Sequence, residues 1–351
     1  MLMLAAMLGI AAVGGILMID EDGDDSTTSD TGSGADNDAD ASANIASETV
    51  SLDQFILLGT NGSDQLGGTE VDEDIQGRDG NDQLNGQGGK DSVQAGAGDD
   101  TAHGGDGDDT VLGGDGQDLL HGEAGDDLLA GQDGDDTLFG HFGDDTLDGS
   151  AGNDLGHGGQ GDDTLQGGSG RDALHGNADN DYLSGGQDQD TLFGGTGNDR
   201  LVGNDDGTTR DYLNGGDGDD TIFAGTGDVV TAGEGGDRIL LDSSPFQATF
   251  DSDDDENTDP NAPIDLLDFD TSEDQLVVIW DQFGPDTPVV EVSLDPDAPG
   301  EHIVSIDGKE AMRVTGPEVL TAADILVVDH EAAIRFGMVA NANGGDALTL
   351  G

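Results

Sequence analysis

Aspartate recurs at every ninth position through the middle of the chain, and glycine surrounds it. Read in nines from Gly59, the repeat keeps its register through sixteen units to Val202. The unit Gly104–Leu112 (GGDGDDTVL) is representative, with glycine at positions one, two and four, aspartate at six and an apolar residue at eight. Carboxylate and carbonyl oxygens without His or Cys favour Ca²⁺ over zinc or copper, and Mg²⁺ is less suitable because it demands a tight octahedron. The repeat therefore predicts a series of calcium sites.

Each unit divides into a six-residue turn and a three-residue strand. Neighbouring side chains of a strand point to opposite faces, so position eight faces inward while seven and nine face outward. Two units then form one coil of a flattened roll, and the inward residues stack as two facing ladders. They include Leu66, Leu84, Val111, Leu120, Leu129, Leu138, Leu147, Leu165, Leu174, Leu183, Leu192 and Leu201. At roughly 1.5 to 3 kcal/mol per buried Leu or Val this core is thin, and Ala102 and Gly156 are its weak points.

The pattern G-G-x-G-x-D-x-U-x, with U apolar, resembles that of the RTX (repeats-in-toxin, hemolysin-type) calcium-binding proteins over Gly59 to Leu240. The resemblance implies an all-β fold: a calcium-bound parallel β-roll, or right-handed β-solenoid of nonapeptide repeats, followed by a small C-terminal β-rich domain. It also implies that each Ca²⁺ lies between turns eighteen residues apart, held by Asp carboxylates and backbone carbonyls. Carried over by position, the candidate calcium ligands are Asp64, Asp82, Asp91, Asp100, Asp109, Asp118, Asp127, Asp136, Asp145, Asp154, Asp163, Asp172, Asp181, Asp190, Asp199, Asp211, Asp220 and Asp237.

Three units depart from the pattern. In the second unit Val71 replaces the fourth glycine and Glu73 replaces the aspartate. The unit at residues 203–214 is lengthened to twelve residues, and the unit at residues 224–231 is shortened to eight around Asp228. We therefore leave Glu73 and Asp228 out of the predicted ligand set.

The composition supports cations as partners. Asp and Glu number 78 against 9 Lys and Arg, and the net charge of −69 opposes a compact metal-free chain. Nucleic acid is excluded as a partner, because its phosphates need Lys and Arg to displace counterions. The chain has no cysteine and 62 glycines, so neither disulfides nor apolar burial alone offsets the entropic cost of ordering it. We expect folding to be coupled to metal binding.

The flanking segments have other compositions. Residues 1–19 are apolar throughout and form the only segment predicted to contact a membrane, as an uncleaved anchor or targeting segment, an atypical signal peptide or a buried helix. Residues 20–49 are typical of an acidic disordered linker, and residues 50–58 predict a strand that caps the first edge of the roll. Residues 241–351 predict a C-terminal β-rich domain, with strands expected within 265–280, 289–294, 302–306, 311–314 and 325–328.

The RTX resemblance further implies export by a type I secretion apparatus, directed by an uncleaved C-terminal signal. The tail at residues 338–351 (MVANANGGDALTLG) is compatible with that signal. We therefore expect a secreted, extracellular or cell-surface protein.

Four histidines occupy position nine at multiples of eighteen residues: His103, His121, His157 and His175. They predict one outward column on the roll, with neighbours about 5 Å apart. The column is either a transition-metal or pH-sensitive patch or, as we prefer, an ordinary exposed strand face.

These features favour a non-enzymatic extracellular protein that folds as it binds many Ca²⁺ ions. One alternative is a cell-surface adhesion or glycan-binding module that uses the C-terminal β-domain, and no macromolecular ligand is indicated by the sequence. An enzyme would need a cleft within residues 241–351, and no H-E-x-x-H, G-x-S-x-G or P-loop motif is present. An ice-binding face would need a regular Thr or Asn row, whereas the third positions of the repeats are mixed.

Overall fold

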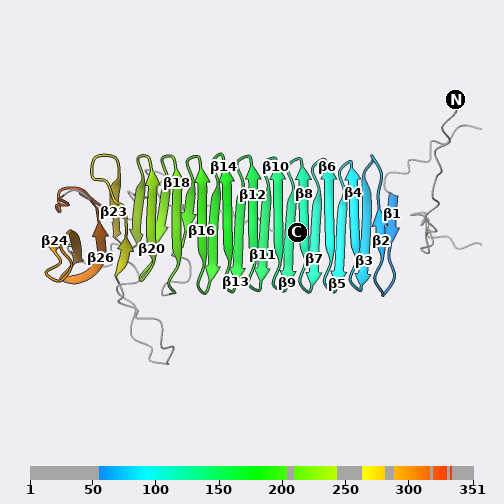
Figure 1. Cartoon of the computed structure of the whole chain (residues 1–351), viewed down its shortest axis with the longest axis horizontal. Coiled ribbons are helices and arrows are strands. Elements are labelled where there is room, and N and C mark those ends of the chain that lie inside the picture. Colours follow the sequence, from blue (N-terminus) through cyan, green and yellow to red (C-terminus); the bar gives the residue numbers. More distant parts are fainter. Residues whose placement is uncertain are drawn as a thin grey trace, which may run out of the picture.

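The fold is that of a parallel β-solenoid built from two long sheets. The computed structural model describes residues 55–203, 209–242, 263–280, 288–316, 319–329 and Ala333. Its strands lie side by side across the long axis of the molecule, from β1 at one end to β24 at the other (Figure 1). The all-β parallel roll predicted from the repeat is confirmed.

Among the described residues, one sheet has thirteen strands and the other has fourteen. The first contains β1 (Phe55–Leu58), β3 (Glu73–Asp79), β5 (Ser92–Ala97), β7 (Thr110–Asp115), β9 (Leu128–Asp133), β11 (Thr146–Ala151), β13 (Thr164–Ser169), β15 (Tyr182–Gln187), β17 (Arg200–Val202), β19 (Thr221–Ala224), β21 (Arg238–Asp242), β23 (Gln275–Trp280) and β27 (Ile325–Asp329). The second contains β2 (Gln65–Gly67), β4 (Gln83–Gly88), β6 (Thr101–Asp106), β8 (Leu119–Ala124), β10 (Thr137–Phe142), β12 (Leu155–Gln160), β14 (Ala173–Ala178), β16 (Thr191–Thr196), β18 (Tyr212–Asp217), β20 (Val229–Glu234), β22 (Ile264–Leu266), β26 (Lys309–Thr315), β25 (Glu301–Ile306) and β24 (Val290–Leu294).

Consecutive repeat strands alternate between the two sheets, so each strand pairs in parallel with the one two units away. Leu138, for example, lies opposite Leu120 on one side and Gly156 on the other, eighteen residues away in each direction. The lengthened unit changes this offset to twenty-one residues, and the shortened unit changes it to seventeen. Both length changes fall between strands, because the inward residues Leu192, Leu213 and Val230 remain in register.

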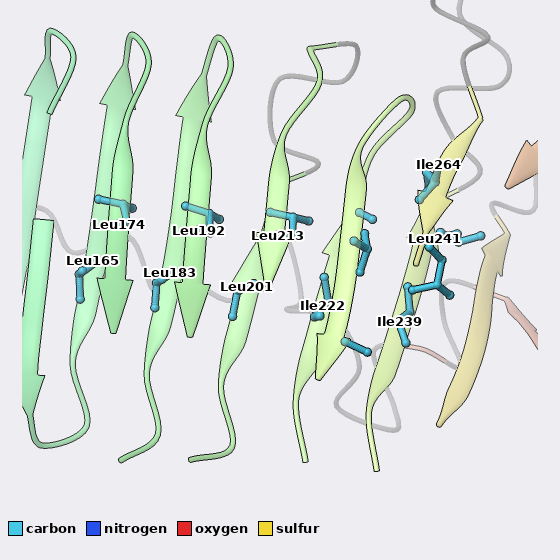
Figure 2. Close-up of a cluster of buried hydrophobic side chains, with 14 of the residues drawn as sticks. Leu165, Leu174, Leu183, Leu192, Leu201, Leu213, Ile222, Ile239, Leu241 and Ile264 are labelled. Carbon is cyan, nitrogen blue, oxygen red and sulfur yellow. The ribbon is translucent and has the colours of Figure 1, made fainter. Parts of the chain in front are cut away.

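The core lies between the sheets and consists of the residues at position eight. Figure 2 shows Leu165, Leu183 and Leu201 in one row and Leu174, Leu192 and Leu213 in the facing row. These six side chains are buried, as the sequence predicts.

At the two small residues of the core, Ala102 and Gly156, neighbouring residues fill the space. Ala102 is fully buried. At Gly156, an added Cβ would lie only 2.9 Å from the Cδ2 atom of Leu174, so that leucine already fills the space.

Both sheets continue beyond the repeats. β22 pairs in parallel with β20, β23 pairs in parallel with β21, and β26 and β27 extend the two sheets further. β24 and β25 complete the end of the second sheet as antiparallel strands. The strands predicted in this region are present, except that the segment 265–280 contains two strands, β22 and β23. A turn separates them, in which the backbone N–H groups of Glu273 and Asp274 both donate to the carbonyl oxygen of Asp270.

β1 lies at the first edge of the roll and covers residues 55–58 of the segment 50–58, for which a capping strand was predicted; residues 50–54 lie outside the described residues. The segment 1–19, the linker 20–49 and the tail 338–351 lie outside the described residues. Within the described part of the chain, no helix is long and apolar enough to span a membrane.

Candidate calcium-binding turns

The position-six aspartates lie in two columns, one along each edge of the roll. From Asp82 onward, each of these carboxylates accepts, through Oδ1, the backbone N–H of the acid one coil earlier. Asp136 donates to Asp154 Oδ1 at 2.7 Å, and Asp145 donates to Asp163 Oδ1 at 2.8 Å. The same bond spans the irregular units, from Asp190 to Asp211 and from Asp199 to Asp220. Backbone N–H groups of one coil therefore hold the carboxylates of the next coil in position.

The second carboxylate oxygen, Oδ2, has a different environment. In most of the column it is buried, and no hydrogen-bond donor of the described residues reaches it. This holds for Asp82, Asp91, Asp100, Asp109, Asp118, Asp127, Asp136, Asp145, Asp154, Asp163, Asp172, Asp181, Asp199, Asp220 and Asp237. Burying an ionised oxygen without a hydrogen-bond partner costs free energy. A proton or a cation at each of these oxygens would offset that cost.

Burial also changes the acidity of these groups. Removal from water, with a smaller contribution from neighbouring aspartates, raises the pKa of Asp181 to about 8 and the pKa of Asp163 to about 7. The same two causes raise the pKa of Asp118 and of Asp127 to about 7. At neutral pH the columns are therefore stable in the folded chain only when protons or cations neutralise them.

Glycine predominates at position four, where the backbone has positive φ, although Asp179 and Asp188 occupy this position with φ values of 76° and 75°. Gly134 has a φ of 144°, in the region that side chains rarely adopt, and a Cβ there would overlap the carbonyl group of Gly116 in the preceding coil. Position two also has positive φ, but it accepts larger residues, such as Gln132 (81°) and Asn177 (82°). The predicted need for glycine at position two is therefore weaker than at position four.

Glycine at position one has another role. A Cβ on Gly104 would lie 2.5 Å from Asp109 Oδ2, and the corresponding space at Gly113 is bordered by both Asp118 Oδ2 and the carbonyl oxygen of Gly131. The absence of a side chain keeps space open beside the unpartnered oxygen. This arrangement of carboxylate and carbonyl oxygens fits a hard cation, for which six to eight oxygen ligands are usual.

Side chains alone do not complete a metal site. Within the described residues, no three His, Cys, Asp or Glu side chains are grouped so that they could hold a metal ion. A calcium ion in these turns would therefore depend on backbone carbonyls for most of its ligands, as the sequence also indicates.

The predicted ligands all fall in the two columns, but Asp64 differs from the rest. It is half-buried in the first turn, and its Oδ2 accepts hydrogen bonds from the backbone and hydroxyl of Thr60. Asp64 therefore lacks the unpartnered oxygen found at most of the other positions.

Three further acids occupy the columns: Glu73 and Asp228, which were left out of the predicted ligand set, and Asp274, which the sequence analysis missed. The backbone N–H of Glu73 donates to Asp91, Asp228 accepts the N–H of Asp211, and Asp274 accepts the N–H of Asp237. Each of the three precedes an inward apolar residue by two positions, as in Asp228 and Val230. Counting from this acid-x-apolar signature, rather than from the glycines, would have found them.

Comparison with known families agrees with this geometry. The model of the RTX calcium-binding nonapeptide repeat matches in overlapping segments at residues 67–102, 85–120, 94–129, 121–155, 157–192, 184–207, 193–230 and 206–240. A search of curated proteins finds no match to the chain.

Proposed function

The chain belongs to the family of RTX calcium-binding repeat proteins, and from this we propose that it is a non-enzymatic, exported protein whose roll folds as it binds many Ca²⁺ ions. The observation that carries the proposal is the double column of buried aspartates, most of which have an Oδ2 atom that no donor of the described residues reaches. Calcium at these positions would neutralise the columns and hold neighbouring coils together.

The location follows from the same physical argument. A chain of net charge −69 is expected to stay extended where calcium is scarce, as inside a cell, and to order where calcium is abundant. An extended chain suits a type I secretion apparatus, and folding outside would then be driven by calcium binding. We place the working protein outside the cell or on the cell surface.

A calcium titration of the full chain tests the proposal. Far-UV circular dichroism should show a cooperative gain of β-structure between chelated protein and about 10 mM CaCl₂, whereas MgCl₂ at equal ionic strength should give little. Equilibrium dialysis should show several Ca²⁺ ions bound per chain. A chain that is fully folded in chelator and indifferent to calcium would overturn the proposal and leave the acids a solvating role.

A further inference from the structure

A ladder of aromatic rings runs along the outer face of the second sheet. Consecutive rings are stacked, with centroids 4.6 to 5.1 Å apart. Strand pairing at eighteen-residue intervals holds them in one outward column, as the sequence predicts for the histidines. The members are His103, His121, Phe139, His157, His175 and Phe193, one from each of β6, β8, β10, β12, β14 and β16.

An open hollow of about 370 Å³ lies beside the middle of the ladder, on the adjacent strands β10, β12 and β14 (Figure 1). It forms at Gly159, which has no side chain. Gly159 pairs with His141 on one neighbouring strand and with Asn177 on the other, and both of these residues line the hollow. Because paired strands lie about 4.8 Å apart, His141 and Asn177 are separated by about 10 Å along the roll. The sequence thus opens a slot one strand wide between them.

The lining of the hollow is aromatic and polar but carries no acidic or basic chain. It includes Phe139 and His157 of the ladder and, farther along the same strands, Phe142 and Gln160. Burial, with a smaller contribution from His175, lowers the pKa of His157, so this ring is uncharged at neutral pH. Among the described residues that line the hollow there is no Asp, Glu, Lys or Arg, although the whole chain has a net charge of −69.

Phe142 has no role in the packing of the roll. Its side chain is 57% exposed and belongs to neither core cluster. The residues paired with it on the neighbouring strands are Ala124 and Gln160, so the repeat does not require an aromatic residue there. The phenyl ring is therefore available to a ligand in the hollow.

The two ends of the slot are held in place by hydrogen bonds to the ladder. His141 Nε2 lies 2.9 Å from His121 Nδ1, and Asn177 donates from Nδ2 to the backbone carbonyl oxygen of His175 at 3.2 Å. Both end residues have positive φ, 80° at His141 and 82° at Asn177. A ligand in the slot would meet polar groups that are already ordered, which lowers the entropic cost of binding.

We propose that this hollow binds one neutral sugar residue of an oligosaccharide. The apolar C–H groups of the sugar would contact Phe142, and its hydroxyl groups would form hydrogen bonds with His141, Gln160 and Asn177. The volume falls in the range of roughly 300 to 1,000 Å³ that is usual for small-ligand sites. An acidic ligand is repelled by the net charge of the chain, and a cationic ligand finds no carboxylate in the lining.

This inference goes beyond calcium binding and requires only that the roll is folded. It also differs from the glycan site that the sequence offers as an alternative within residues 241–351, because the hollow lies on the repeats. Sugar binding and calcium-driven folding can therefore fail independently, and the circular dichroism spectrum reports folding by itself.

The calcium-saturated full chain is tested on immobilised oligosaccharides in about 10 mM CaCl₂. The neutral probes are maltotriose, cellotriose, mannotriose and chitotriose, and sialyllactose is the acidic comparison. At least one neutral probe should retain the chain, whereas sialyllactose should not. Calorimetry with the retained sugar then gives the affinity for each variant.

The chain itself supplies matched variants. F142Q copies Gln160 of the neighbouring strand, and loss of the phenyl contact should weaken binding about tenfold. G159N copies Asn177 and fills the slot, so it should abolish binding. F193H copies the histidines of the ladder at a residue outside the hollow, and it should bind as the unaltered chain does. All three should keep the circular dichroism spectrum of the unaltered chain in calcium.

Two results would refute the proposal. One is a folded chain that none of the four neutral probes retains, and the other is sugar binding of unchanged affinity in F142Q. Sedimentation velocity distinguishes a different occupant: if the chain is a dimer that F142Q dissociates and no neutral sugar binds, the hollow is a contact between two copies and not a sugar site.

Discussion

The two oxygens of each buried aspartate have separate roles. At Asp163, Oδ1 accepts the backbone N–H of Asp145, whereas Oδ2 is buried without a donor. The first oxygen orders neighbouring coils, and the second is the one that calcium would engage. An asparagine at this position keeps an oxygen that can accept the backbone N–H, but it removes the negative charge that calcium binding requires.

The variant D163N should therefore fold but bind calcium less well. We expect a higher midpoint in the calcium titration and a lower number of bound ions, because one carboxylate is lost from the column. The matched control is D162N, which removes the same charge from the neighbouring exposed residue at position five, where Asn153 and Asn180 occur in other units. Equal midpoints for the two variants would show that overall charge, and not the buried oxygen, governs binding.

Most of the column residues can be predicted from the sequence, because the nine-residue phase fixes both the acid and the inward apolar residue. Asp228 was left out because its unit is shortened to eight residues, and Asp274 was missed because a long intervening segment separates it from the last full repeat. Glu73 was left out because its unit departs from the pattern, with Val71 in place of the fourth glycine and Glu73 in place of the aspartate. In the structure Glu73 is buried at the column position, and its Oε atoms accept hydrogen bonds from Thr69. Its own turn thus supplies the partners that the aspartates lack.

At the scale of the element, the turn depends on the close approach of successive coils. Gly134 stands directly against Gly116 of the preceding coil, and its φ of 144° is one that a side chain strains. The strands tolerate variation at positions seven and nine, whereas at Gly134 a side chain would meet the backbone of the preceding coil.

The variant G134A should destabilise the calcium-loaded roll by about 1 to 3 kcal/mol, because the new Cβ strains the backbone and displaces the neighbouring coil. Thermal unfolding in saturating calcium measures the effect. G62A is the control: Gly62 holds position four of the first turn, and an added Cβ there meets nothing within 4 Å. A similar loss of stability in both variants would contradict the proposed steric role.

The strands of the C-terminal part were expected from their apolar pattern, but not their pairing. The glycine-rich repeats end after Leu240, so the sequence predicts that a new domain begins there. In the structure Leu276 nevertheless lies opposite Ile239, and Leu266 lies opposite Val230, so both sheets continue. Such pairing depends on contacts distant in sequence, which a local repeat pattern does not report.

At the scale of the whole molecule, buried carboxylates link folding to pH. In the folded chain without calcium, burial raises the pKa of Asp109 to about 6 and the pKa of Asp181 to about 8, above the value of about 3.9 for an exposed aspartate. The folded state therefore binds more protons than the unfolded state. These groups favour folding fully below about pH 4, and that contribution is lost as the pH rises through the range of about 6 to 8.

Acid should therefore substitute in part for calcium. In chelator, lowering the pH from 8 to 5 is expected to increase β-structure in circular dichroism, because protons neutralise the columns; pH 5 stays above the isoelectric point of about 4.1. With limiting calcium the same change should release bound Ca²⁺, because protons compete for the carboxylates.

The control separates the buried columns from the acidic surface. NaCl at pH 8 screens repulsion between exposed charges but does little for charges held away from water. If the columns determine folding, salt in chelator should restore much less β-structure than acid does. Equal recovery with salt would assign the effect to surface repulsion from the net charge of −69, and a loss of β-structure on acidification would contradict the sign derived from the raised pKa values.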